Sequence, residues 1–224
     1  MSDPLVLVPG HMCGAWLYAH QMAAFPDAII ADVNRDDTVA AIAGRLLESA
    51  PARFHIAGLS MGGMVAMEVM AEAPDRVASA CLTATDPTEA RPKEITWRSD
   101  LIYEGIEAYV ATFVRQFVRH DPEGLAGLAE EVQGHMAGTP EAVIRAQAHA
   151  LDTRREMAPR IAGYNGPVEV IAGARDRVCP PHLHEDLAAQ IPNARLTVVP
   201  DCGHMVTLEK PDDVLRALLR LVRA

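Results

Sequence analysis

The chain has 224 residues, of which 50% are hydrophobic and 22% are charged, a composition typical of a globular protein and not of a disordered one. Its formal net charge of −10 at pH 7 argues against the basic surface with which proteins bind nucleic acid or an anionic membrane. The length suits one domain with a sizeable core and a modest insertion.

The N-terminus and the cysteines favour a cytoplasmic location. Residues 1–4 carry no positive charge and lead directly into an apolar segment, so we expect no cleavable signal peptide. No apolar run approaches the ~20 residues that span a bilayer. Cys13, Cys81, Cys179 and Cys202 form no C-x-x-C pair and no zinc-like spacing, and we expect reduced thiols that pack as small side chains.

Short apolar segments alternate with helical patterns at both ends of the chain. Helices are predicted near residues 15–24, 39–49 and 64–71. Strands are predicted near residues 4–8, 28–33, 54–59, 77–83, 168–173 and 194–199. The alternation indicates an α/β fold with a mostly parallel sheet of about six strands and helices on both faces.

From about residue 87 to residue 163 the strand pattern stops and helical patterns replace it. Asp121-Pro122 and Thr139-Pro140 each look like an N-cap followed by proline at the first helical position. Apolar residues recur at helical spacing in two stretches: Ile106, Tyr109, Val110, Phe113, Val114 and Phe117, then Leu125, Leu128, Val132 and Met136. We predict a core of residues 1–86 and 164–224 and a helical insertion of residues 87–163.

Residues 54–63, FHIAGLSMGG, place Ser60 in a Gly-x-Ser-x-Gly motif between a predicted strand and a predicted helix. That context favours a nucleophile elbow over a glycine-rich turn with an incidental serine. The elbow brings strand and helix so close that residues two before and two after the serine must be small, and Gly58 and Gly62 meet this requirement.

Two further motifs follow later strands. Asp176 comes after the strand predicted at residues 168–173, and His204 comes after the last predicted strand. A Gly loop, Pro9-Gly10-His11-Met12, follows the first strand. These motifs, in the order serine, acid, histidine, resemble the α/β-hydrolase superfamily over nearly the whole chain.

The resemblance implies an α/β-hydrolase fold with a small helical cap and a catalytic triad of Ser60, Asp176 and His204. One oxyanion-hole N–H would come from His11, with Met12 as the alternative, and the second from Met61. The implied reaction is hydrolysis of a carboxylic ester or lactone through an acyl-enzyme, without a metal or other cofactor. We expect a small-molecule substrate, in a pocket formed by Met12, Tyr109, Phe113 and Phe117, and a protein that is a monomer or a homodimer.

Several residues offer alternatives. Asp86 follows the strand at residues 77–83 and could be the acid, although a turn residue before proline is favoured. His182 and His184 are expected to be solvated and not to bind a metal, because no third ligand is near in the sequence. His135 and His149 fall in the helical insertion and could face the pocket, although positions on the helix surface are favoured.

Alternative activities of the same fold stay open. A cofactor-free peroxidase or dioxygenase would keep the same three residues, and a non-catalytic small-molecule receptor could keep them too. A hydroxynitrile lyase would carry a lysine beside the histidine, where this chain has Met205.

Overall fold

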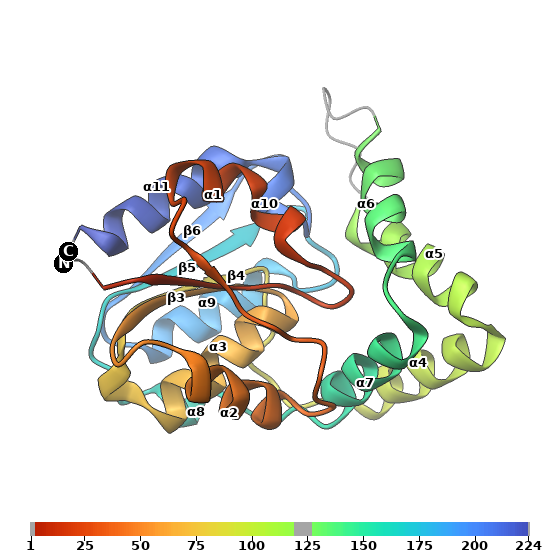
Figure 1. Cartoon of the computed structure of the whole chain (residues 1–224), viewed down its shortest axis with the longest axis horizontal. Coiled ribbons are helices and arrows are strands. Elements are labelled where there is room, and N and C mark those ends of the chain that lie inside the picture. Colours follow the sequence, from red (N-terminus) through yellow and green to blue (C-terminus); the bar gives the residue numbers. More distant parts are fainter. Residues whose placement is uncertain (1–2, 119–126, 224) are drawn as a thin grey trace.

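The computed structural model describes residues 3–118 and 127–223. A sheet of six strands, all parallel, forms its centre in the order β2-β1-β3-β4-β5-β6, as predicted (Figure 1). The strands are β1 (Leu5–Val8), β2 (Ile29–Ile30), β3 (Phe54–Leu59), β4 (Val77–Thr83), β5 (Val168–Gly173) and β6 (Ala194–Val199). The order reverses direction after β2, so β1 and β3 lie side by side near the middle of the sheet.

Helices cover both faces of the sheet. One face packs against α1 (Ala19–Ala24), α10 (Val206–Glu209) and α11 (Pro211–Val222), and the other packs against α2 (Val39–Ser49), α3 (Met61–Glu72), α8 (Ala158–Ile161) and α9 (Pro181–Gln190) (Figure 1). Two 3₁₀ turns, η1 (Ala15–Tyr18) and η2 (Pro74–Arg76), complete the core elements.

The side chains of the strands feed two separate hydrophobic cores. In β1, Leu5 and Leu7 join the core under α11, whereas Val6 and Val8 join the core under α3. Successive side chains of a strand point to opposite faces, so a strand buried on both sides reads as a continuous apolar run. That is why this strand was recognisable in the sequence.

Among the described residues, α8 and four further helices lie between β4 and β5, where the insertion was predicted. Helix α8 packs against the core helices α3 and α9; the other four are α4 (Pro92–Glu104), α5 (Ile106–Phe117), α6 (Leu128–Ala137) and α7 (Glu141–Asp152). In Figure 1 they stand together to one side of the sheet. The described residues of both predicted apolar stripes pack in or against one hydrophobic core, and Phe113 and Val132 share that core with the strand residue Leu7. These helices therefore roof one end of the sheet and do not form a separate core.

The structure differs from the sequence prediction in two local details. Strand β2 pairs only at Ile29 and Ile30, because this edge strand has one neighbour and soon leaves it. Helix α7 begins at Glu141: Pro140, with ψ of 140°, is still extended and precedes the first helical residue. Leu125 and the Asp121-Pro122 pair lie outside the described residues, and the exact division into core and insertion stays a prediction.

Among the helices described, none has the length and apolar character to cross a bilayer.

Candidate active site

Ser60 occupies a strained turn between β3 and α3. Its φ of 57° lies in the left-handed region that non-glycine residues rarely adopt. The Ser60 N–H donates to the Thr83 carbonyl at 2.9 Å, and the Ser60 carbonyl accepts the Thr85 hydroxyl at 2.8 Å. The end of β4 and the segment after it thus hold the turn from both sides, at the carboxyl edge of the sheet.

The glycines of the motif are required by backbone contacts. A Cβ added at Gly58 would lie 2.2 Å from the carbonyl oxygen of Gly62, and one added at Gly62 would lie 2.0 Å from the carbonyl oxygen of Val8. Neither backbone can move without displacing the strand beside it. Any larger residue at these two positions therefore shifts the turn that carries Ser60.

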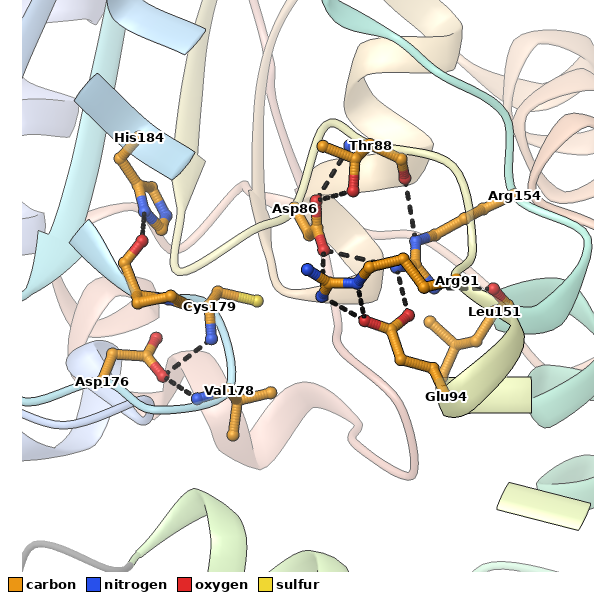
Figure 2. Close-up of polar contacts among 11 residues, drawn as sticks. Asp86, Thr88, Arg91, Glu94, Leu151, Arg154, Asp176, Val178, Cys179 and His184 are labelled. Atoms are coloured by element: carbon orange, nitrogen blue, oxygen red, sulfur yellow. Dashed lines mark hydrogen bonds and ion pairs between the residues drawn. The ribbon is translucent and has the colours of Figure 1, made fainter. Parts of the chain in front are cut away.

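Asp176 and His204 come from neighbouring loops and are hydrogen-bonded to each other. His204 Nδ1 lies 2.8 Å from Asp176 Oδ2, with both side chains buried. The other carboxylate oxygen, Oδ1, accepts the N–H groups of Val178 at 2.8 Å and Cys179 at 3.0 Å (Figure 2). These two hydrogen bonds, together with the one to His204, fix the orientation of the carboxylate.

The second ring nitrogen of His204 is available. Nε2 is buried and has no hydrogen-bond partner among the described residues. With Nδ1–H donating to the carboxylate, a neutral ring presents Nε2 as a proton acceptor. The Phe117 ring stacks on the imidazole with centroids 4.8 Å apart, which limits its rotation.

Glu209 holds the loop that carries His204, and sequence reasoning missed it. Its side chain accepts the N–H of Gly203 at 2.6 Å and the N–H of Met205 at 3.1 Å, on both sides of the histidine. A glutamate in a helical turn after a loop has no distinctive sequence pattern, so only the folded geometry shows this contact.

The loop after β1 holds both candidates for the first oxyanion-hole N–H, His11 and Met12. The Met12 N–H is engaged: it donates to Gln147 Oε1 at 2.8 Å. The N–H groups of His11 and of Met61, the residue after Ser60, donate to no acceptor in the part of the chain that the structure describes. Of the two candidates in the loop, His11 is the one whose amide is free to bind a ligand.

The ring of His11 takes part in a buried network that the sequence did not predict. His11 Nδ1 lies 3.0 Å from Gln147 Oε1, and Nε2 lies 3.0 Å from the Tyr109 hydroxyl. Burial is the main cause that lowers the pKa of His11 to about 3, so the ring is neutral near pH 7. Since Gln147 Oε1 can only accept, Nδ1–H donates to it and Nε2 accepts the Tyr109 O–H.

A cavity of about 280 Å³ opens at Ser60. Of the four residues expected to form a substrate pocket, Phe113 and Phe117 line this cavity; Met12 and Tyr109 are not among its lining residues and are buried. One part of the lining is apolar, with Met64, Trp97, Phe113, Phe117, Leu151 and Val178. The other part is charged, with Asp86, Glu94, Arg98, Arg154 and Arg177.

Asp86, the alternative acid, belongs to an ion-pair cluster in this cavity. Its carboxylate accepts the N–H and the hydroxyl of Thr88 at 2.9 and 2.7 Å (Figure 2). Arg154 and Arg91 approach it at 3.3 and 3.6 Å. With Asp176 already paired to His204, the geometry favours Asp176 over Asp86 as the partner of the histidine.

The other histidines and the cysteines have structural roles or lie at the surface. His184, expected to be solvated, is buried: its Nε2 accepts the Thr85 N–H at 2.9 Å, and burial lowers its pKa. His182, His135 and His149 are exposed, and His135 stacks on Trp16. The four cysteines are free and buried, and burial raises the pKa of each thiol. No group of three or more His, Cys, Asp or Glu side chains within the described ranges could hold a metal ion.

Comparisons with known proteins place the chain in a family. The sequence model described as Alpha/beta hydrolase family matches residues 5–217. The chain is 27% identical over 249 residues to the putative non-heme bromoperoxidase BpoC of Mycobacterium tuberculosis, covering 98% of this chain and 93% of that protein. It is 27% identical over 189 residues to the pimeloyl-[acyl-carrier protein] methyl ester esterase of Nitrosomonas europaea, covering 79% of this chain and 73% of that protein. The enol-lactonase from Burkholderia xenovorans LB400 has the same fold, with a TM-score of 0.86 at 20% identity over 100% of this chain and 93% of that one. The chain belongs to the alpha/beta hydrolase family.

Proposed function

We propose that this protein hydrolyses a carboxylic ester or lactone of a small molecule, with Ser60 as nucleophile, His204 as general base and Asp176 as the residue that orients the histidine. The observation that carries the proposal is the state of His204, whose Nδ1 is bound to Asp176 while its buried Nε2 has no partner. Ser60, on its strained turn, lines the cavity whose wall includes Phe117, the residue stacked on His204.

The chemistry follows from these groups. A serine hydroxyl is a weak nucleophile near neutral pH and needs a base that removes its proton during attack. His204 Nε2 takes the proton as Ser60 Oγ bonds to the substrate carbonyl carbon, and then gives it to the departing alcohol. A water molecule, deprotonated by the same nitrogen, then attacks the acyl carbon, and the proton returns from His204 Nε2 to Ser60 Oγ as the bond between the acyl group and Ser60 breaks. Asp176 stabilises the imidazolium that forms in each half-reaction.

The negative charge on the substrate oxygen needs donors that are already in place. The N–H groups of His11 and Met61 have no acceptor among the described residues, and they flank the serine from the β1 loop and from the start of α3. Removing one such donor costs about 3–4 kcal/mol of transition-state stabilisation in a well-studied hydrolase. We propose these two amides as the oxyanion hole.

The names of similar proteins support an ester-bond substrate. Two are a pimeloyl-[acyl-carrier protein] methyl ester esterase and an enol-lactonase, and both names denote action on a carboxylic ester bond. At 27% and 20% identity neither name carries over as a substrate for this chain. They agree with the reaction class that the site favours.

Hydrolysis of p-nitrophenyl butyrate tests the proposal. We expect turnover by the wild-type protein and a loss of at least about 10³-fold in Ser60→Ala and in His204→Ala. Ser99→Ala, an exposed serine on α4, is the matched control and should keep full activity. Turnover in Ser60→Ala at the rate of the control would contradict the assignment.

A second candidate function is a cofactor-free peroxidase, favoured by the likeness to a protein named as a putative non-heme bromoperoxidase. Bromination of monochlorodimedone with hydrogen peroxide and bromide measures it directly. Bromination by the wild-type protein, without hydrolysis of any ester in a short-chain panel, would replace the hydrolase proposal. A lyase or a non-catalytic receptor would catalyse neither ester hydrolysis nor bromination.

A further inference from the structure

Arg98 has donor groups that nothing in the described structure satisfies. The residue lies on α4, is only 6% exposed, and lines the same cavity as Ser60. Its Nε donates to Asp152 Oδ1 at 2.5 Å, but the buried Nη2 has no hydrogen-bond partner among the described residues. Leaving a buried charged donor without an acceptor is costly, so the site as it stands lacks one partner.

The neighbouring buried arginine of this cavity, Arg154, has an acceptor for each of its three nitrogens. Arg154 donates from Nε to the Thr88 carbonyl at 3.0 Å and from Nη1 to the Leu151 carbonyl at 2.9 Å. Its Nη2 reaches Glu94 at 2.7 Å and Asp86 at 3.3 Å (Figure 2). Arg154 therefore has a structural role, whereas Arg98 still has N–H groups that can bind a ligand.

The charges around the cavity leave room for an anion. The carboxylates of Asp86 and Glu94 are shared between Arg154 and Arg91 and are not free to neutralise Arg98. Arg177, exposed on the same cavity, has no ion-pair partner within the described ranges. The cavity lining carries three arginines and two carboxylates. Asp152, paired with Arg98, and Arg91, paired with Asp86 and Glu94, add one charge of each sign, so one positive charge remains in excess in a chain of net charge −10.

We propose that Arg98 forms a carboxylate-binding subsite, so that the substrate is an ester or lactone that also carries a carboxylate on a short apolar chain. This inference rests on the proposed hydrolase function. A guanidinium presents paired N–H donors in a plane and binds carboxylate through two parallel hydrogen bonds. The apolar wall of Met64, Trp97 and Phe113 would contact the chain between the two groups.

Asp152 places a negative charge beside Arg98, and its position decides which nitrogens of the guanidinium can bind an anion. It binds Arg98 at Nε and so leaves the terminal nitrogens as the face for a ligand. It also fixes the guanidinium between α4 and α7 before any substrate arrives. Since less side-chain entropy is then lost on binding, the arginine is preorganised for an anion.

Two methyl esters of equal chain length test the subsite. Monomethyl adipate ends in a carboxylate and methyl hexanoate ends in a methyl group, and release of methanol measures both. We expect Arg98→Gln to lower kcat/KM for monomethyl adipate by at least about 10-fold, mainly through KM, and that for methyl hexanoate by less than about 3-fold. Arg98→Lys should be intermediate, because it keeps the charge without the paired donors.

Lys93→Gln is the matched control, because it removes one positive charge from an exposed position on the same helix. It should leave the ratio of the two substrates unchanged. Equal losses on both esters in Arg98→Gln would show a merely structural role and overturn the subsite. The net charge of −10 repels an anionic ester, and high salt screens this repulsion. A preference of the wild-type protein for methyl hexanoate that persists at high salt would therefore also overturn the subsite.

Binding separates failure of the subsite from failure of the proposed function. If neither ester is hydrolysed, the hydrolase proposal fails, but calorimetry with hexanoate and hexanamide still decides the subsite in the wild-type protein. The subsite predicts that hexanoate binds more tightly than hexanamide, and that Arg98→Lys reduces the difference. Equal affinities would contradict it, even if Arg98→Gln does not fold.

Discussion

The side-chain oxygen of Gln147, on helix α7, accepts the backbone N–H of Met12 at 2.8 Å and so ties the helical insertion to the loop after β1. The same oxygen accepts the Nδ1–H of His11, and the amide nitrogen donates to Val33 and Asn34. The reversed amide would point a donor at the Met12 N–H, so this orientation is required. Helices far away in the sequence therefore position the proposed oxyanion loop.

Replacing Gln147 should impair catalysis more than binding. Gln147→Leu leaves the Met12 N–H and the His11 ring without their acceptor, which frees the loop to shift. We expect kcat to fall about 10- to 100-fold, since a displaced donor stabilises the oxyanion less, with a smaller change in KM. Gln133→Leu, an exposed glutamine on α6, is the control. An unchanged kcat in a well-folded Gln147→Leu protein would disprove this role.

The two candidate acids should respond differently. Asp176→Asn removes the acceptor that fixes His204, and we expect a loss of about 10⁴-fold in kcat, as when a triad aspartate is neutralised elsewhere. Asp86→Asn weakens the ion pair with Arg154, so we expect a loss of about 1–3 kcal/mol in stability and a kcat within a few-fold of wild type. Chemical denaturation and ester kinetics on both variants check this. The opposite pattern would move the acid to Asp86.

The roof of the cavity should control substrate length. Phe113→Leu enlarges the cavity without touching the Ser60 turn, and we expect the kcat/KM ratio of hexanoate to acetate p-nitrophenyl esters to change by about 10-fold. Reaction with a small fluorophosphonate should change little. Tyr103→Leu, at a side chain 93% exposed on α4, is the control. If Phe113→Leu folds well and the ratio stays at the wild-type value, the insertion does not set specificity.

The buried His11 should make stability depend on pH. In the unfolded chain its ring takes up a proton near pH 6.5, but in the folded protein only near 3. The neutral, buried ring has its full effect on the free energy of unfolding above pH 6.5. Below pH 6.5 this free energy falls by ~1.4 kcal/mol per pH unit, because the unfolded chain binds a proton that the folded protein does not. Between pH 6.5 and 5 the wild type should lose about 2 kcal/mol more than His11→Asn in urea denaturation. Parallel pH profiles of the two proteins would show that the ring is not held neutral.

The features that were predictable from the sequence are those set by short stretches of chain. The turn at Ser60 needs two glycines at fixed spacing and a strand before it, and both are visible in ten residues. The contacts of Gln147, Glu209 and Arg98 join residues that only the fold brings together, and no local pattern marks them. His184 was recognisable in part, since it shares a helix face with Leu183 and Leu187, both buried. The prediction placed the start of this helix at the surface and did not use that spacing.

The most direct test of the central claim is the site of reaction with an alkyl fluorophosphonate, located by peptide mass spectrometry. Such a probe phosphonylates a serine that has an adjacent base and free oxyanion donors, and it leaves ordinary serines untouched. The account predicts one adduct, on the peptide that contains Ser60, formed much more slowly in His204→Ala and absent in Ser60→Ala. An adduct on another residue, or an unlabelled Ser60 in a protein that still hydrolyses esters, would contradict it.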